Sequence, residues 1–444
     1  MSGMRMPRWA KALLMIAAMS AKPAWGRQLL RAHKAVAEQS SILGRKQPFR
    51  QTLHNYQNVQ YFADFKIGGQ DIPGIFDTGS FELLVRSSRC DKCVHPTPPY
   101  DRTKSQSYME NGTITKHVFG SGPCVSMMGY ETVQVGDMVA KEQAFWEIVS
   151  HQITVLNKAK FAAIVGIGPN FAYGHTEQTL LMSYGVEEFS ICLQKKSGSP
   201  GFLTWGPVAN KEEKEKKFAK ADVVGEHHWV ARLHNISFGE KSEAHLANMP
   251  CMGSGCAAIV DSGTSLIAAP GVALMQLSEM IEPIKEDCSN IDELPTLHFV
   301  IDGKDFELPP QAYIMRVTGA ILEADSIWDV LFFKPKIRKL DMCMPAFMQI
   351  DMMSQFGPVW ILGMPFFRYY HTIFDREERA MYFAKAGPNC EALPYQADRS
   401  TELLSSSEHR LERQPMEVDV DSLVPPTLSG MIDYPYSTKG ELML

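Results

Sequence analysis

The stretch IPGIFDTGSFELLV, residues 72–85, places a carboxylate at the end of an otherwise apolar run. Such a run predicts a buried β-strand, and burying a charged Asp77 is costly unless hydrogen bonds compensate it. The next residues, Thr78, Gly79 and Ser80, offer two hydroxyl groups and accessible backbone N–H groups. Because D-x-G sequences are also common in ordinary turns, this stretch alone favours a turn at the end of a strand.

A second stretch, CAAIVDSGTSLIAAP at 256–270, repeats this pattern later in the chain. Asp261 repeats the carboxylate of Asp77, and an apolar run again leads into it. The small polar residues that follow in this copy are Ser262, Gly263 and Thr264. Two such copies are hard to explain as unrelated turns, so we expect a duplicated structure that brings the two carboxylates together.

Each copy is followed by a second pair of similar segments. FAAIVGIG lies at 161–168 in the first half, and WILGMPFF lies at 360–367 in the second. Short apolar runs broken by Gly, Pro and Asn fill the rest, and helical periodicity is confined to short pieces such as 272–284. We therefore expect a mostly β protein made of two related lobes.

Two further segments carry polar residues without apolar periodicity. The run KEEKEKK at 211–217 is expected to be a solvated surface loop near the boundary between the lobes. The tail at 391–444 is rich in Ser, Glu, Pro and Asp. We expect it to be disordered, because it cannot bury enough apolar surface to offset the entropy of ordering.

The composition of the 444 residues, 45% hydrophobic and 21% charged, indicates an ordinary globular protein of two or three domains. A net charge of -6 gives no sign of the basic surface that nucleic-acid binding requires. The sequence contains no G-x-x-x-x-G-K-[ST], no H-E-x-x-H and no paired C-x-x-C pattern. We therefore expect no nucleic-acid partner, no cofactor and no metal.

The amino terminus has the order of a secretory signal peptide in residues 1–26. Three cations, Arg5, Arg8 and Lys11, precede the apolar run ALLMIAAM, which is too short to span a bilayer. A soluble amphipathic start is the alternative. Residues 27–50 are basic, and they form either a solvated linker or an inhibitory prosegment. The cations of such a prosegment would pair with active-site carboxylates until acid or proteolysis releases it.

Nine cysteines favour an oxidising compartment, because several lie in close pairs flanked by turn-forming residues. The expected pairs are Cys90 with Cys93, Cys251 with Cys256 and Cys288 with Cys343. Three cysteines remain, so at least one thiol is unpaired: Cys124, Cys192 and Cys390. Sequons at Asn111 and Asn235 would be glycosylated if exposed. We expect a protein of the secretory pathway, either secreted or held in an acidic vacuole or lysosome-like compartment.

Two aspartates held side by side have a defined chemistry. Full charges about 3 Å apart repel by about 5 kcal/mol at an effective dielectric of about 20, equivalent to roughly four pK units. At mildly acidic pH, Asp77 and Asp261 would therefore share one proton. The ionised member can act as general base toward a water held between them, and the protonated member can act as general acid toward a carbonyl oxygen. Attack on an amide then needs no covalent enzyme adduct.

The residues around the pair have matching roles. We expect the inner carboxylate oxygens to accept from the backbone N–H groups of Gly79 and Gly263, and the outer ones from hydroxyl groups. The hydroxyl donors would be Ser80 and Thr264. The residues expected to bond across to the opposite loop are Thr78 and Ser262. A bulky side chain at either glycine would prevent the close approach.

These features resemble the pepsin-like aspartic endopeptidases over residues 55–386. The motifs that carry the likeness are IFDTGS, GYETVQVG, FAAIVGIG, IVDSGTSL, LPTLHFVIDGKDFELPPQAYI, WILGMPFFRYY and FDREERAMYFAKA. The resemblance implies a bilobal pepsin-like β fold with lobes at 51–205 and 206–390, around a central cleft that binds an extended polypeptide. It implies that Asp77 and Asp261 are the catalytic pair, and we expect a monomer.

The resemblance also implies a flap, a β-hairpin that closes over the cleft with its tip in HVFGSG at 117–122. The implied substrate-binding residues are Ile75, Phe119, Gly120, Ser121 and Phe161. The apolar members of this set imply a preference for hydrophobic residues beside the scissile bond.

Three positions depart from the family pattern. Phe119 stands where the family usually has a Tyr, and Leu84 where it usually has a Trp hydrogen-bonded to that Tyr. Because both partners are missing, no polar group is stranded, and we expect an active enzyme with a differently seated flap. Met364 stands where the family often has an Asp. The loss of that charge is expected to lower the pKa of the catalytic pair.

Two other functions compete with this interpretation. A non-catalytic homologue would bind a peptide or glycan in the cleft, but loss of an Asp would favour that reading and both are present. DSGTS also resembles the D-x-S-x-S of a metal-dependent adhesion site, but Gly263 stands where that motif needs a hydroxyl ligand. A purely structural role would leave two buried carboxylates without a purpose.

Overall fold

The computed structural model describes residues 48–94, 96–119, 122–171, 179–239, 251, 255–281, 284–323, 336–395 and 415–419. The expected signal peptide, and the expected prosegment up to residue 47, lie outside these ranges. In the described ranges, no helix has both the length and the apolar character needed to cross a membrane.

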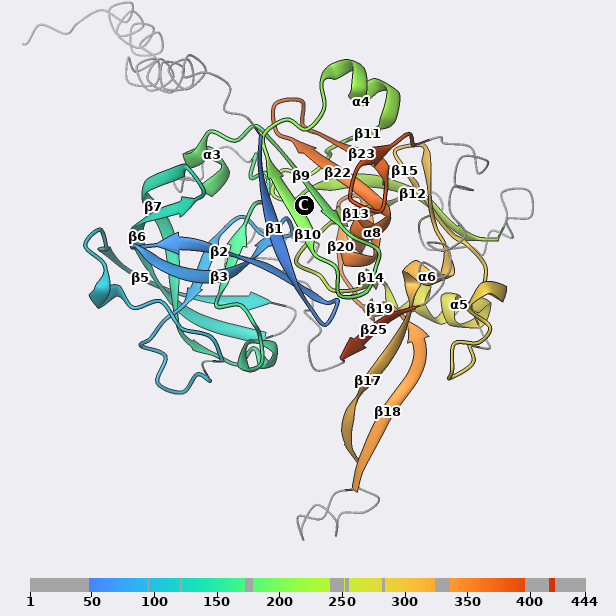
Figure 1. Ribbon diagram of the computed structural model, residues 1–444, viewed down its shortest axis with the longest axis horizontal. Coiled ribbons are helices and arrows are strands. Elements are labelled where there is room, and N and C mark those ends of the chain that lie inside the picture. The colour runs from blue at the N-terminus through green and yellow to red at the C-terminus, as the bar shows by residue number, and fades with distance from the viewer. Residues whose placement is uncertain are drawn as a thin grey trace, which may run out of the picture. The chain divides into compact units, whose positions relative to one another are not determined.

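The described part of the chain is mostly β-structure, as predicted, with short helices between the strands (Figure 1). The strands of the first half are β1 (Phe49–Tyr56), β2 (Gln60–Ile67), β3 (Gln70–Asp77), β4 (Leu83–Arg86), β5 (Met109–Phe119), β6 (Gly122–Val135), β7 (Met138–His151), β8 (Ala163–Gly166), β9 (Glu188–Leu193) and β10 (Gly201–Trp205). The later strands are β11 (Ala219–Asp222), β12 (Val230–Phe238), β13 (Cys256–Val260), β14 (Ile267–Ala269), β15 (Leu297–Ile301), β16 (Lys304–Leu308), β17 (Ile314–Glu323), β18 (Lys336–Pro345), β19 (Phe347–Gln349), β20 (Met353–Ser354), β21 (Gly357–Leu362), β22 (Tyr370–Asp375), β23 (Ala380–Ala386), β24 (Ala392–Leu393) and β25 (Met416–Asp419). The helices are α3 (Leu180–Tyr184), α4 (Lys211–Lys217), α5 (Gly271–Ile281), α6 (Pro310–Tyr313) and α8 (Met364–Tyr369), with short 3-10 turns at η1 (Arg102–Lys104), η2 (Thr154–Asn157) and η3 (Ile291–Glu293).

The burial of the strands explains how a carboxylate reaches the interior. In β2, buried residues alternate with more exposed ones along most of the strand, as expected when one face of a strand is open to solvent. The last four residues of β3, from Gly74 to Asp77, are all buried. A run of apolar residues without alternation is typical of a strand covered on both faces. This run carries Asp77 into the core.

Two equivalent strand arrangements hold the two Asp residues. β3 pairs in parallel with β8, and β13 pairs in parallel with β21. In each case the strand after the Asp, β4 or β14, pairs antiparallel with the same partner strand. The segments FAAIVGIG and WILGMPFF therefore supply the middle strand of each arrangement. The duplication expected from the sequence is present in the strand pairing.

The two halves share one sheet, which runs β11-β23-β22-β9-β10-β1-β2-β3-β8-β4-β7-β6-β5. β9 of the first half pairs antiparallel with β22 of the second. Figure 1 shows this join where the green strand β9 lies beside the orange strand β22. The second half has a further eight-stranded sheet, and β17, β18 and β25 form a three-stranded one.

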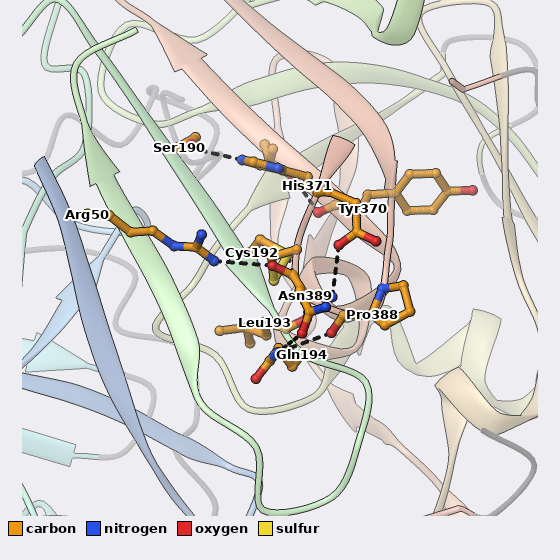
Figure 2. Close-up of a disulfide and its surroundings, with 12 residues drawn as sticks. Arg50, Ser190, Cys192, Leu193, Gln194, Tyr370, His371, Pro388 and Asn389 are labelled. Atoms are coloured by element: carbon orange, nitrogen blue, oxygen red, sulfur yellow. Dashed lines mark hydrogen bonds between the residues drawn. A yellow bond between two sulfur atoms is a disulfide. The ribbon is translucent and has the colours of Figure 1, made fainter. Parts of the chain in front are cut away.

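A disulfide between Cys192 and Cys390 lies beside this join (Figure 2). Cys192 belongs to β9, and Cys390 follows β23. Nearby, Arg50 donates a hydrogen bond to the carbonyl oxygen of Asn389, and its guanidinium carbon lies 3.6 Å from the ring centre of Phe202. The last two residues of the expected prosegment, Phe49 and Arg50, belong to β1.

The prediction of a solvated loop at 211–217 is wrong, because this run forms helix α4. Asn210 begins the helix with a capping box. Lys214 is buried, and its ammonium nitrogen lies 2.6 Å from a carboxylate oxygen of Glu188 and 2.9 Å from one of Asp375. Alternating charges along a sequence cannot reveal that one of them has buried partners on distant strands.

Part of the tail expected to be disordered is ordered. β24 pairs with β23, and β25 pairs in parallel with β17. Val418 of β25 is 3% exposed and packs in a cluster with Val59 and Leu266. The prediction of disorder is wrong for these strands, because the edges of β17 and β23 supply backbone partners that no composition argument can anticipate.

Candidate active site

The loops after β3 and β13 bring Asp77 and Asp261 together. We call residues 77–82 the Asp77 loop and residues 261–266 the Asp261 loop. Both carboxylates are completely buried, and they are hydrogen-bonded to each other. A Cβ added to Gly79 would lie 2.6 Å from Cγ of Asp261, and one added to Gly263 would overlap the Asp77 carboxylate. Each loop therefore reaches the carboxylate of the other through a glycine.

Each carboxylate is also held by donors from its own loop. The backbone N–H of Gly79 donates to Oδ1 of Asp77 at 2.9 Å, and the hydroxyl of Ser80 donates to Oδ2 at 2.6 Å. The corresponding donors to Asp261 are the N–H of Gly263 at 2.7 Å and the hydroxyl of Thr264 at 2.5 Å. The two carboxylates therefore have equivalent sets of donors, one backbone N–H and one hydroxyl each.

Hydrogen bonds between the loops keep them in register. The hydroxyl of Thr78 donates to the carbonyl of Val260 at 2.8 Å and accepts from the N–H of Ser262 at 2.9 Å. The hydroxyl of Ser262 donates to the carbonyl of Phe76 at 2.6 Å and accepts from the N–H of Thr78 at 3.2 Å. Both residues therefore reach the opposite strand as the sequence pattern predicts.

The electrostatics of the pair favour one bound proton. Burial raises the pKa of Asp261 well above its usual value, and the adjacent carboxylate of Asp77 raises it further. Hydrogen bonds from Thr264 and Gly263 oppose this shift, because they stabilise the ionised form. The site can thus hold a carboxylic acid and a carboxylate next to each other in mild acid.

His228 is a buried neighbour of the Asp77 loop that no sequence pattern identifies. It is completely buried and forms a hydrogen bond with the backbone of Gly79. Burial, and to a smaller extent the adjacent His227, lowers the pKa of His228 to about 4, against the effect of that hydrogen bond. A neutral imidazole therefore supports the loop over most of the acidic range.

Two predicted substrate-binding residues, Ile75 and Phe161, lie in one apolar cluster. They are 2% and 1% exposed and pack with Leu84 and Trp146. Trp146 lies opposite Leu84 in the parallel pairing of β4 with β7. The cluster therefore keeps a tryptophan next to position 84, although it comes from another strand. Only the pairing of β4 with β7 reveals it.

The hairpin of β5 and β6, which we call the flap hairpin, occupies the sequence position implied for the flap. Its pairing ends with Phe119 opposite Gly122. Phe119 is the last residue of β5, and the predicted tip residues Gly120 and Ser121 lie outside the described residues. Met364 is buried, and its N–H donates to the carbonyl of Thr264 at 2.9 Å, next to the Asp261 loop.

The cysteines form four disulfides. Three are the pairs expected from the sequence: Cys90 with Cys93, Cys251 with Cys256, and Cys288 with Cys343. The fourth joins Cys192 to Cys390. Cys124 is free and buried, and burial raises the pKa of its thiol to about 12.

The two sequons have different surroundings. Asn111 is exposed on β5, and its amide donates to the hydroxyl of Tyr130 at 3.1 Å. Asn235 is half-buried within β12, which has partner strands on both sides. The surroundings therefore favour glycosylation of Asn111 over that of Asn235.

Among the described residues, His298, Asp305 and Glu307 offer ligand atoms close enough for a metal ion. Nδ1 of His298 lies 3.1 Å from each carboxylate oxygen of Asp305, and Nε2 lies 2.9 Å from the carbonyl oxygen of Gly239. The hydrogen bond to Asp305 raises the pKa of His298, against the effect of burial. Because both ring nitrogens face acceptors, a doubly protonated imidazolium fits this site better than a metal ligand.

Known proteins are similar in sequence to this chain over most of its length. A family model for eukaryotic aspartyl protease matches residues 60–386. Cathepsin D of Chionodraco hamatus is 29% identical over 379 residues, covering 81% of this chain and 89% of that protein. Cathepsin D of Rattus norvegicus is 30% identical over 366 residues, covering 77% and 84%. Renin of Rattus norvegicus is 27% identical over 434 residues, covering 87% and 100%. The matched residues include both Asp loops and the flap hairpin, and the chain belongs to the eukaryotic aspartyl protease family as an aspartic-type endopeptidase.

Proposed function

We propose that Asp77 and Asp261 hydrolyse peptide bonds by activating one water molecule held between them. The observation that carries this proposal is the pair itself: two buried, hydrogen-bonded carboxylates, each with one N–H donor and one hydroxyl donor. Such a pair supplies an acid and a base within reach of the same substrate carbonyl.

The raised pKa of Asp261 favours Asp261 as the member that holds the proton. The carboxylate of Asp77 removes a proton from water as the water oxygen attacks the peptide carbonyl carbon, and Asp261 gives its proton to the carbonyl oxygen. The product is a neutral gem-diol. The C–N bond breaks when Asp77 passes its proton to the amide nitrogen and a gem-diol hydroxyl returns a proton to Asp261.

The contacts between the loops hold the two carboxylates in the arrangement that this mechanism needs. Thr78 and Ser262 hold the strands at a fixed separation, so the two carboxylates need little rearrangement during the reaction. The glycines Gly79 and Gly263 leave room for the opposite carboxylate. We assign these four residues, with Ser80 and Thr264, to catalytic support.

We further propose a preference for hydrophobic residues beside the scissile bond. Ile75 and Phe161 belong to an apolar cluster that also contains Ile164 of β8, the strand that pairs with β3 next to Asp77. Phe119, Gly120 and Ser121 complete the proposed substrate-binding set at the flap. An apolar surface of this kind stabilises the bound peptide, because binding removes apolar substrate side chains from water.

Four disulfides fit an oxidising compartment, and an acid-acting pair fits an acidic one. We therefore propose that the enzyme enters the secretory pathway and acts as a monomer on polypeptides, either in an acidic organelle or after secretion. Residues 1–26 would be the signal peptide, and the basic segment that follows would be an inhibitory prosegment removed from the zymogen.

Cleavage of an unstructured protein at acidic pH tests the catalytic proposal. Wild-type protein should cleave it, a statine-type transition-state mimic should block cleavage, and Asp77→Asn and Asp261→Asn should each abolish it. Thr78→Ser, which keeps the hydroxyl, is the matched control and should remain active. Retained cleavage in both Asn variants would overturn the assignment.

A peptide series tests the preference separately. Peptides with Leu or Phe beside the scissile bond should be cleaved with a higher kcat/KM than otherwise identical peptides with Lys or Asp. Each extra methylene in an apolar pocket contributes roughly 1 kcal/mol, about fivefold. Equal rates across the series would leave the catalytic assignment intact and remove the proposed preference.

A further inference from the structure

A buried carboxylate and imidazole lie close together near the tip of the flap hairpin. Nδ1 of His117 lies 3.6 Å from a carboxylate oxygen of Glu82, and the two side chains are 0% and 4% exposed. Ionisable side chains are seldom so fully buried without a compensating partner. The contact joins two parts of the chain with different roles, the flap hairpin and the Asp77 loop.

Glu82 is fixed to the catalytic aspartate through the backbone. It is the last residue of the Asp77 loop, and its carbonyl accepts a hydrogen bond from the N–H of Gly166 at 2.9 Å. The next residue, Ile167, donates to the carbonyl of Asp77 at 2.8 Å. The end of β8 therefore holds Asp77 and Glu82 in one hydrogen-bonded unit. A displacement of Glu82 would therefore also shift the backbone at Asp77.

The carboxylate of Glu82 has little other compensation. Within the described residues, neither of its oxygens has a hydrogen-bond partner. Its negative charge contributes to the raised pKa of Cys124, after the larger effect of burial. The imidazole of His117 is therefore the polar group in contact with this buried carboxylate.

His117 holds the flap side of the contact. It lies on β5, two residues before Phe119, close to the tip of the flap hairpin. In the hairpin it pairs with Cys124, and its ring lies edge-on to Trp146 with 4.9 Å between ring centres. Trp146 lies opposite Leu84 on β4, the strand that begins just after Glu82. The imidazole is thus enclosed between the Asp77 loop and the neighbouring strands.

We propose that Glu82 and His117 are positioning residues that lock the flap hairpin to the Asp77 loop. This role rests on the proposed function, because a flap affects the rate only if the Asp pair is catalytic. The contact between the two side chains fixes the position and register of β5 relative to Asp77. The flap then closes on a bound peptide in one orientation, and misplacing reacting groups by about 1 Å can cost about a hundredfold in rate.

The test compares Glu82→Gln with Glu188→Gln. Both changes replace a buried carboxylate with an amide of the same shape, but Glu188 on β9 pairs with Lys214 of α4, away from the flap hairpin. Activity is measured as separate kcat and KM values on one peptide. Hydrogen exchange is followed by mass spectrometry in β5 and β6 and, as an internal reference, in β22 and β23.

We expect Glu82→Gln to lower kcat/KM by about tenfold or more, mainly through kcat, and to speed exchange in β5 and β6 alone. Glu188→Gln should leave kcat within about twofold of wild type, because Glu188 does not position the flap hairpin. The fall in kcat of Glu82→Gln is expected to come from a misplaced flap and not from lower stability. The proposal is overturned if Glu82→Gln keeps wild-type kcat and KM, or if its exchange rises equally in β22 and β23.

A double variant guards against a single variant that fails to fold. Glu82→Gln with His117→Gln leaves no lone buried charge, so it should fold while still lacking the lock. It should retain the low kcat and the fast flap exchange. A double variant with wild-type kcat and exchange would overturn the proposal. Hydrogen exchange can be measured without peptide cleavage, so it tests the Glu82–His117 contact even if the Asp pair is not catalytic. The catalytic role of the Asp pair is tested separately by Asp77→Asn.

Discussion

At the scale of single residues, hydroxyl groups tune the two carboxylates. The hydroxyl of Thr264 donates to Asp261 at 2.5 Å and lowers the pKa that burial raises. Thr264→Val removes this donor to the ionised form, so the pKa of Asp261 should rise. The fall in kcat/KM on the alkaline side of the pH profile should therefore move to higher pH.

A pH profile of kcat/KM on one peptide checks this shift. Ser278→Ala is a suitable control, because the Ser278 hydroxyl donates to the carbonyl of Met275 on α5 and has no contact with the Asp loops. An alkaline limb that stays in place, or moves to lower pH, would contradict the role given to Thr264.

Buried histidines should limit stability in acid. The pKa of His228 is about 4 in the folded protein, against about 6.5 in the unfolded chain, so between these values the unfolded chain binds more protons. The free energy of unfolding should therefore fall as pH drops from about 6.5 toward about 4, by up to about 3 kcal/mol for this group. Denaturant unfolding of wild type and His228→Gln over this range measures the effect, and the variant should show a flatter dependence.

His298 provides a comparison with the opposite sign. Its pKa is raised by Asp305, so its contribution to stability is complete below about 6.5 and is lost as pH rises through the raised value. His298→Gln should therefore lose stability most in acid, where His228→Gln gains it relative to wild type. The same sign in both variants would show that burial of His228 and the hydrogen bond of His298 to Asp305 do not control the two titrations.

The flap residue Phe119 allows a further prediction. The position that would pair with a flap tyrosine is Leu84, which is completely buried and has no polar side-chain atom. A hydroxyl introduced by Phe119→Tyr would find no partner there, so kcat/KM should change by less than about tenfold. A gain of about a hundredfold, about 2.7 kcal/mol in barrier, would show that the missing hydroxyl is a handicap.

The residues around each Asp follow from the sequence because their partners are local or repeated. Gly79 and Ser80 lie two and three positions after Asp77, and the second copy repeats the spacing. The contact of Glu82 with His117 has no such signal, because it depends on how far β5 lies from the Asp77 loop in space. Long-range side-chain contacts of this kind can be predicted only after the strand pairing is known.

At the scale of elements, β25 extends a sheet that the tail composition does not predict. The amide of Asn58 donates to the carbonyl of Glu417 at 2.7 Å, and Val418 packs with Val59 and Leu266. Leu266 ends the Asp261 loop. Strand β25 is therefore anchored next to the Asp261 loop.

Val418→Asp should release β25. A carboxylate buried among apolar side chains without a partner costs about 2 kcal/mol or more, so the strand should detach and amide exchange in β17 should rise. Hydrogen exchange of β17 measures this, with Glu417→Gln, an exposed change on the same strand, as the control. Unchanged protection of β17 in Val418→Asp would show that β25 contributes little to this edge.

Secondary structure was easiest to predict where one period dominates. The strands around both Asp residues and a helix near 272–284 follow from apolar patterning, and α5 spans Gly271–Ile281. Helix α4 and strand β25 were missed for a common reason: each is stabilised by partners far away in the sequence. Lys214 needs Glu188 and Asp375, and β25 needs the edge of β17.

At the scale of the whole molecule, two lobes share one sheet, and Cys192–Cys390 lies beside the join. Replacing both cysteines with Ala should lower the free energy of unfolding by about 2–5 kcal/mol, because the unfolded chain regains the freedom of a long loop. Thermal unfolding of the double variant tests this, with Cys124→Ala, which removes a free thiol, as control. An unchanged unfolding temperature would show that strand pairing alone holds the join.

The bilobal plan itself was predictable, because a duplicated motif leaves two visible copies. The pairing of Cys192 with Cys390 was not, since three leftover cysteines allow three pairings and the choice depends on β9 meeting β22.

That same bond changes what a cut in the backbone can do. The bonded cysteines are 198 residues apart, and the Asp261 loop lies inside the closed loop. A protease working among other proteases is exposed to nicking there. Any single cut between the two cysteines would leave both fragments covalently tethered, and a cut between Cys192 and Asp261 would leave one aspartate on each fragment. Such a two-chain enzyme would migrate as one species until it is reduced, so an apparently intact band would not prove an intact chain.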